Sequence, residues 1–296
     1  MCNKMDYSDS MKDVKVKKKL LLVGCGDIAT QLGHRMLAHG FAVTAMRRNI
    51  ALLPVEFTDI SGDVTKPETL TALAKMSFDA VVITLTPSAR SEEGYTQSYY
   101  QGTKNILAAL QHNADALLLF ASSTSVYHQA DGSEVDETSP TNPEGYAGQV
   151  MLKTEKLLAD SKNPSVNVRF GGIYRTGQQV FLNQVRAGAV APARDYYSNR
   201  IHSYDCAGVL EHLITCYENG LKLEQCYLAV DCEPAPLVEV VAWLRNQLAD
   251  EIIEDGTELK RRAGSKRCVN RRLLDLGYTF KYPSYREGYR TIIDNA

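Results

Sequence analysis

The chain has 296 residues, 23% of them charged, and a formal net charge of -2 at pH 7. That length can bury a substantial core, as one large domain or two modest ones. The near-neutral charge lacks the basic excess of a nucleic-acid-binding protein, so we expect no nucleic-acid partner. No uninterrupted apolar run approaches the ~18 residues of a membrane helix, and no signal-peptide run opens the chain. We therefore expect a cytoplasmic protein without a membrane segment.

From Leu20 onward, short apolar runs alternate with segments of helical pattern. The apolar runs lie at residues 20–24, 41–46, 80–85, 116–122 and 165–170. Continuous apolar strands separated by helices are typical of a parallel sheet covered on both faces. We predict an α/β fold: a Rossmann-type doubly wound parallel sheet with a smaller C-terminal substrate lobe.

The regular alternation weakens after Gly171, which indicates a change of organisation. We expect residues 1–17 to form a disordered tail and residues 18–175 to form the core around this sheet. Residues 176–296 are expected to form mainly the substrate lobe, with returns to the core sheet.

Two helices are predicted from apolar spacing. In residues 95–111, Tyr99, Ile106 and Leu110 lie at spacings that place them on one face, packed on the sheet. In residues 236–248, the shared face carries Leu237, Val241 and Leu244, with Trp243 beside it as a packing residue.

The first strand runs directly into a glycine-rich turn that opens a helix. Gly24 allows a tight turn, Gly26 lets backbone N–H groups approach a pyrophosphate, and Ala29 lets the helix pack closely on its strand. The helix N-terminus adds partial positive charge. We predict that Gly24, Gly26, Asp27, Ile28 and Ala29 bind a dinucleotide, which would make residues 18–175 an NAD(P)-binding Rossmann core; the alternative is a purely structural turn.

The end of the second strand indicates which dinucleotide is bound. Where an NAD-selective fold offers an acid to the ribose, this chain has Arg47 and Arg48, which suit a 2′-phosphate. NADP is therefore favoured over NAD, although at least one arginine could be a solvated loop charge. Asp63, followed by Val64, either accepts a hydrogen bond from adenine or caps the next helix.

The seven cysteines include no C-x-x-C pair and no histidine at metal-ligand spacing: Cys2, Cys25, Cys206, Cys216, Cys226, Cys232 and Cys268. We interpret them as free thiols of a reducing compartment and predict no metal site.

Several motifs in order resemble the extended short-chain dehydrogenase/reductases, the NAD-dependent epimerase/dehydratase superfamily, and within it the YeeZ-like group. They are "VGCGDIA", "GDVTKPETL", "FASSTSVYH", "VRFGGIY", "RIHSYDCAGVL" and "DLGYTFKYPSYREG". The resemblance implies that Ser123, with Thr124 alongside, holds a substrate oxygen and that Tyr146 is the general acid/base. The superfamily's lysine, one helical turn later, corresponds to Val150.

Without a nearby cation, only about one tyrosine in a thousand is a phenolate at neutral pH. Lys153 would have to fold back over two helical turns to reach Tyr146. Tyr127, His128 and His202 are the other proton-transfer candidates, although packing or loop-fixing roles fit Tyr127 and His202 better. Arg90, after the fourth strand, is placed to meet a substrate carboxylate or phosphate.

Two functions remain open at this point. One is an NADP-dependent oxidoreductase or epimerase/dehydratase acting on a small polar or sugar-like substrate, as a monomer or homodimer. The other is an NADP-binding sensor or scaffold that has lost the catalytic tyrosine–lysine couple, a reading favoured by Val150.

Overall fold

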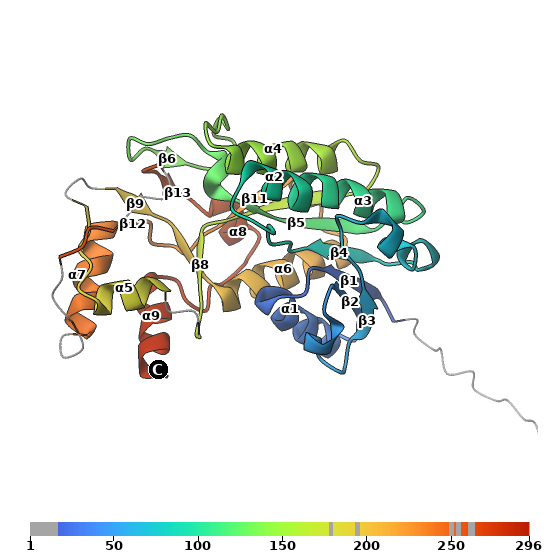
Figure 1. Ribbon diagram of the computed structural model, residues 1–296, viewed down its shortest axis with the longest axis horizontal. Helices are drawn as coiled ribbons and strands as arrows, with labels where there is room; N and C mark the ends of the chain where they lie inside the picture. The colour runs from blue at the N-terminus through green and yellow to red at the C-terminus, as the bar shows by residue number, and fades with distance from the viewer. Residues whose placement is uncertain are drawn as a thin grey trace, which may run out of the picture.

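A seven-stranded parallel sheet forms the centre of the molecule (Figure 1). The computed structural model describes residues 17–177, 180–192, 196–248, 252, 256–259 and 264–295, so the tail expected at the start lies outside the described residues apart from Lys17. In spatial order the strands are β3 (Thr58–Ser61), β2 (Ala42–Arg47), β1 (Lys19–Val23), β4 (Ala80–Ile83), β5 (Leu117–Ser123), β7 (Ser165–Phe170) and β11 (Cys226–Ala229). The order reverses between β1 and β4, so the sheet is doubly wound and the predicted fold class is confirmed.

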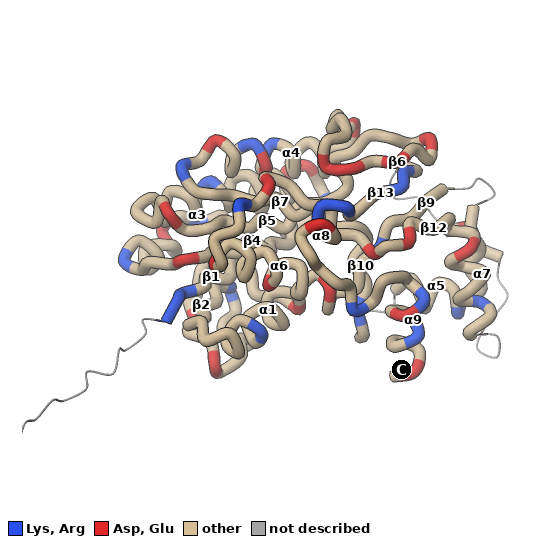
Figure 2. The backbone as a smooth tube through the Cα atoms, turned by 180° about the vertical axis from the view of Figure 1, so that it is seen from behind, with Lys and Arg blue, Asp and Glu red and all other residues tan. Residues whose placement is uncertain are grey.

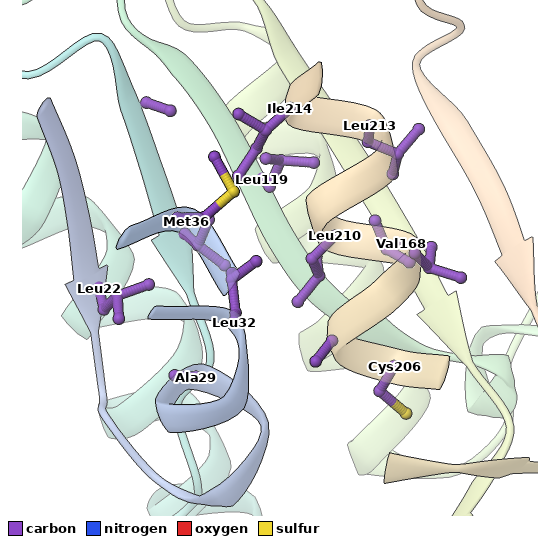
Figure 3. Packing of buried hydrophobic residues seen from close by; sticks show 14 of the residues in the cluster. Leu22, Ala29, Leu32, Met36, Leu119, Val168, Cys206, Leu210, Leu213 and Ile214 are labelled. Carbon is purple, nitrogen blue, oxygen red and sulfur yellow. The ribbon is translucent and has the colours of Figure 1, made fainter. Parts of the chain in front are cut away.

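Apolar side chains bury both faces of the sheet. In β1, Leu20 and Leu22 belong to one core cluster, whereas Leu21 and Val23 belong to the other, because neighbouring residues of a strand point to opposite faces. The helices α1 (Asp27–Ala38) and α6 (Ser203–Glu218) pack together over the first face (Figure 3). The second face is covered by α3 (Gly102–Ala109) and α4 (Tyr146–Ala159).

The segment before β5 differs from the single regular helix that we predicted. It consists of α2 (Glu92–Tyr95), a π-helical stretch η4 (Thr96–Gln101) and α3. A π-helical stretch inserts extra backbone into the helix and so shifts which residues share a face. Ile106 and Leu110 are buried against the sheet as expected, and Tyr99 is partly buried with its ring edge-on to Phe120.

A second lobe lies beyond the carboxyl edge of the sheet (Figure 1). Its strand pairs are β8 (Gly172–Tyr174) with β10 (Arg200–His202), β9 (Tyr197–Ser198) with β12 (Ala235–Pro236), and β6 (Glu134–Val135) with β13 (Arg267–Cys268). Its helices are α5 (Val180–Arg186), α7 (Leu237–Gln247) and α9 (Tyr285–Asp294). The short helix α8 (Arg271–Asp275) packs instead on the core sheet, where it contacts β11 and buries Leu273.

Helix α7 presents its predicted apolar face inward: Leu237, Val241 and Leu244 are buried, and Trp243 packs edge-on against Tyr285 with ring centroids 5.7 Å apart. Between these lobe elements the chain returns to the core, because α6 and β11 pack on or join the main sheet.

Basic and acidic residues are interspersed along the described part of the chain (Figure 2). Within the described residues, no helix is long and apolar enough to cross a membrane. The same part of the chain contains no group of three or more His, Cys, Asp or Glu side chains suited to hold a metal ion.

Candidate functional site

The turn after β1 can be built only with glycine at position 24. Gly24 has a φ of +81°, and a Cβ there would stand 2.8 Å from the Thr84 carbonyl oxygen. The Thr84 hydroxyl donates to the Gly24 carbonyl at 2.5 Å, which ties the turn to the end of β4. A Cβ on Gly26, in contrast, would meet no atom within 4 Å. The loop is therefore closed on its protein side and open above Gly26.

The open side of the loop faces the N-terminus of α1. Gly26 is the N-cap without a side-chain capping bond, and the N–H groups of Asp27, Ile28 and Ala29 have no hydrogen-bond partner among the described residues. Ala29 is fully buried against the sheet. Unpaired amides at a helix N-terminus suit a phosphate, so these residues fit the pyrophosphate of a dinucleotide.

Arg47 is the last residue of β2 and Arg48 follows it. Arg47 reaches back to the loop, where its Nη1 donates to the Cys25 carbonyl at 3.0 Å. Arg48 is exposed. Arg47 thus uses one N–H donor to bind the loop itself. A ribose 2′-phosphate could be bound by its remaining donors and by those of Arg48.

The alternative that Asp63 caps the next helix is wrong. The N-cap of that 3₁₀ turn, Pro67–Leu70, is Lys66, whereas Asp63 Oδ1 accepts from the Thr65 amide at 3.0 Å and the Thr65 hydroxyl at 2.8 Å. Partial burial opposes ionisation of Asp63, but these bonds and nearby Arg48 and Lys66 outweigh it and lower its pKa. Val64 packs in the core, and its carbonyl accepts from Asn105 at 2.8 Å.

At the end of β5, three adjacent hydroxyls have different surroundings. Ser122 is buried and donates to Glu155 Oε1 at 2.5 Å. The Ser123 hydroxyl accepts from the Ser125 amide at 3.1 Å and keeps its own proton to donate. Thr124 lines a large cavity. The hydroxyls at Ser123 and Thr124 are thus the ones that could meet a substrate oxygen.

Tyr146, the residue matched to the superfamily's general acid/base, begins α4 and is 36% exposed. Its hydroxyl donates to the Arg90 carbonyl at 2.9 Å, and its ring lies edge-on to Tyr95. Val150 is buried. Lys153 points elsewhere, because its Nζ lies 4.2 Å from the centre of the Tyr100 ring. No lysine of α4 therefore assists Tyr146.

The other proton-transfer candidates have structural surroundings or lie exposed. Burial raises the pKa of the Tyr127 phenol well above its usual value, and its hydroxyl donates to the Asp136 carbonyl. His202 Nδ1 accepts from the Tyr204 amide and caps α6, and burial lowers the pKa of its imidazole. His128 is exposed.

Asp205 of α6 fixes residues 278–282 against that helix. Its carboxylate accepts from the Tyr278 hydroxyl and from the Lys281 and Tyr282 amides at 2.8–2.9 Å.

A cavity of about 960 Å³ lies between the end of the core sheet and the second lobe. It brings together Arg90 and Thr124, two residues predicted to meet substrate, but Ser123 and Tyr146 are not part of its described wall. The charged residues of that wall are Arg90, Arg200, Lys266 and Glu258. Arg200 and Lys266 are buried, at 8% and 2% exposure.

Lys266 is the cavity residue that sequence reasoning missed most clearly. Its Nζ donates to the Tyr127 carbonyl at 3.3 Å, and the Tyr127 amide in turn bonds to the Thr124 carbonyl. A lysine from the second lobe thus lies one turn from the strand-end hydroxyls. Its only sequence signal was an isolated basic residue in an irregular segment, which predicts nothing by itself.

The comparisons with known proteins agree with this arrangement. The family model described as the RmlD substrate binding domain matches residues 18–193. Protein YeeZ of Escherichia coli K12 is 32% identical over 216 residues, covering 69% of this chain and 75% of YeeZ. An E. coli O157:H7 N-acetyl-α-D-glucosaminyl-diphospho-ditrans,octacis-undecaprenol 4-epimerase is 30% identical over 51% of this chain and 45% of its own.

Among solved structures, one assigned as an NAD-dependent epimerase/dehydratase from Methylobacillus flagellatus has a TM-score of 0.78 and 30% identity, covering 94% of this chain and 98% of its own. A UDP-glucose 4-epimerase structure has a TM-score of 0.77 at 16% identity, covering 93% and 96%, which shows the fold alone.

The doubly wound sheet, the glycine loop and the second lobe over the carboxyl edge define a fold of the NAD-dependent epimerase/dehydratase type. The chain belongs to the RmlD substrate binding domain family, within the extended short-chain dehydrogenases/reductases.

Proposed function

We propose that the chain is an NAD(P)-dependent oxidoreductase or epimerase/dehydratase acting on a small, anionic, polar or sugar-like substrate. The observation that supports this most is the position of the glycine loop, which has free space above Gly26. The loop adjoins the sheet edge that carries the strand-end hydroxyls and the basic residues of the cavity. The Methylobacillus relative is named as an NAD-dependent enzyme, and this supports a nicotinamide cofactor for the present chain. We expect a cytoplasmic enzyme, monomeric or homodimeric.

The residues that would hold the cofactor are Gly24, Gly26, Asp27, Ile28, Ala29, Arg47, Arg48, Asp63 and Val64. When bound, the nicotinamide supplies or accepts a hydride. NADP is the favoured form, because two arginines stand at the end of β2 where an NAD-selective site has an acid.

Within the substrate site, Ser123 and Thr124 would orient the reacting oxygen, and Arg90, Arg200 and Lys266 would attract the substrate's anionic group. Three cations against one carboxylate in the described cavity wall support an anionic substrate. Tyr146 would move the proton only if its hydroxyl left the Arg90 carbonyl.

A second function is a catalytically silent NADP sensor or scaffold. The observation that favours it is the buried Val150 together with the engaged Tyr146 hydroxyl. A sensor would bind NADPH with the same loop but turn over no carbonyl compound.

A paired titration with NADPH and NADH, followed by nicotinamide fluorescence, tests the proposal. We expect NADPH to bind at least about tenfold more tightly, a difference of ~1.4 kcal/mol. Failure of both nucleotides to bind at millimolar concentration would overturn both the enzyme and the sensor. If NADPH binds, its oxidation in the presence of a panel of phosphorylated and carboxylated carbonyl compounds separates the two.

A further inference from the structure

An ion pair joins the glycine loop, at the start of α1, to the second lobe. Asp27 is the first residue of α1, and its Oδ1 lies 3.4 Å from Nη1 of Arg175, which directly follows β8. Asp27 Oδ2 accepts from Gln31 Nε2 at 3.1 Å, and the same amide nitrogen donates to the Ser203 hydroxyl at 3.3 Å. Both oxygens of the Asp27 carboxylate are therefore engaged. Because Gln31 orients this carboxylate, the carboxylate in turn positions the Arg175 guanidinium.

We propose that Arg175 is a further cofactor-binding residue, whose guanidinium binds the pyrophosphate of the dinucleotide and which Asp27 holds ready at the mouth of α1. The inference rests on the proposed function, because it assumes that a dinucleotide occupies the loop.

The helix dipole provides the first argument. Negative charge is favoured near a helix N-terminus and positive charge is disfavoured there, so Asp27 alone needs no further explanation. Arg175 does, because a cation at this end of α1 is disfavoured unless an anion lies beside it. Asp27 is that anion in this structure, and the pyrophosphate would be a second one.

The charge of the loop itself also favours an arginine at this position. A pyrophosphate above the amides of Asp27, Ile28 and Ala29 would lie close to the Asp27 carboxylate and be repelled by it. Arg175 neutralises that carboxylate and has five N–H donors, enough to bind both a carboxylate and a phosphate. With 38% and 34% of their side chains exposed, Arg175 and Asp27 are accessible to a ligand from solvent.

The position of Arg175 links the cofactor to the substrate cavity. Gly172, Ile173 and Tyr174 of β8 line that cavity, and Arg175 is the next residue. A guanidinium anchored on the cofactor would therefore hold one wall of the cavity in place.

The test is a fluorescence titration of the full chain with NADPH for wild type, Arg175→Gln and Asp27→Asn. We expect Arg175→Gln to weaken binding at least about tenfold, since a charge-assisted phosphate contact is lost. Asp27→Asn removes both a charge that repels the pyrophosphate and the anion that positions Arg175, so it should weaken binding less than Arg175→Gln does. The matched control is Arg286→Gln, which removes a 36% exposed arginine paired with Glu233 in the second lobe and should not change affinity.

Titrations at rising NaCl add an independent readout. The affinity of wild type should fall more steeply with salt than that of Arg175→Gln, because one ionic contact fewer is screened. If Arg175→Gln folds poorly, Arg175→Lys replaces it, with an affinity between wild type and the loss expected for Gln because lysine keeps the charge but not the planar fork.

A structural ion pair without a role in binding would give a different pattern. Both Arg175→Gln and Asp27→Asn would then lower the melting temperature while binding NADPH within twofold of wild type, and this would overturn the inference. Failure of wild type itself to bind NADPH would instead overturn the proposed function.

Discussion

Glu155 and Arg169 form a buried ion pair beneath the end of β5. Arg169 Nε and Nη2 donate to the two carboxylate oxygens at 3.0 and 2.7 Å, and the two side chains are only 5% and 8% exposed. Ser122 and Tyr127 complete the network. The pair therefore fixes the strand end from which Ser123 and Thr124 project.

Arg169→Met is expected to lower the free energy of unfolding by about 3–5 kcal/mol, because it leaves a carboxylate buried without its charged partner. Urea denaturation measures the change. Lys156→Gln on the same α4 is the control: its pair with Asp160 is 75% and 61% exposed and should contribute too little to detect. Equal effects of the two substitutions would contradict the prediction.

Ser123→Ala should slow hydride transfer by about 100-fold, because the hydroxyl that would hold the reacting oxygen is lost. Its NADPH affinity should stay that of wild type, since the residue lies away from the phosphate loop. Single-turnover oxidation of NADPH, with the first carbonyl compound that wild type reduces, measures the rate. Ser125→Ala is the neighbouring control, and an equal rate for both variants would remove Ser123 from the mechanism.

At the scale of elements, the two glycines of the glycine loop have different roles: Gly24 allows the turn to fold, and Gly26 leaves space for a ligand. Gly24→Ala should destabilise the protein by about 1–3 kcal/mol, because it strains a positive φ and brings a Cβ 2.8 Å from the Thr84 carbonyl. Gly26→Ala should lower the melting temperature much less than Gly24→Ala and weaken NADPH binding at least about tenfold, because its Cβ would occupy the open space above the loop. Thermal melts and titrations of both variants measure this contrast. A Gly26→Ala protein that binds NADPH like wild type would contradict a ligand above Gly26.

The strands and the loop could be predicted because their signals are local. The run from Leu20 to Val23 is apolar and ends at a glycine, so strand and turn follow from neighbouring residues. The π-helical stretch Thr96–Gln101 could not, since ordinary helical residues fill it and the departure lies in the backbone. Lys266 and Arg175 gain their positions from contacts with distant segments, which no local pattern carries.

At the scale of the molecule, the junction of the two lobes buries ionisable groups. Burial raises the pKa of Asp231 to about 8, against the smaller opposing effects of the Glu233 amide and Arg200. Its Oδ2 has no hydrogen-bond partner among the described residues. Because the folded protein holds this proton while the unfolded chain releases it near pH 4, Asp231 favours the fold at low pH and opposes it as the pH rises toward 8.

Asp231→Asn should therefore remove a decline in stability between about pH 4 and pH 8. His202 acts in the opposite direction, because its lowered pKa reduces stability as the pH falls below the ordinary pKa of histidine. Wild type and Asp231→Asn both retain His202, so its effect cancels in the comparison. Urea denaturation of wild type and variant across this range gives the difference. A difference that does not change with pH would show that Asp231 is ionised in the fold.

The return of α6 and β11 to the core has a consequence for how the protein can be divided. A fragment ending at Arg175 would lack α6, whose Leu210 and Ile214 face Met36 and Leu32 of α1, and would leave β7 as a bare sheet edge (Figure 3). The two lobes are separate in space but not along the chain. The residues up to Arg175 therefore cannot be expressed, exchanged or grafted as an independent module, and the two lobes should melt in one cooperative transition.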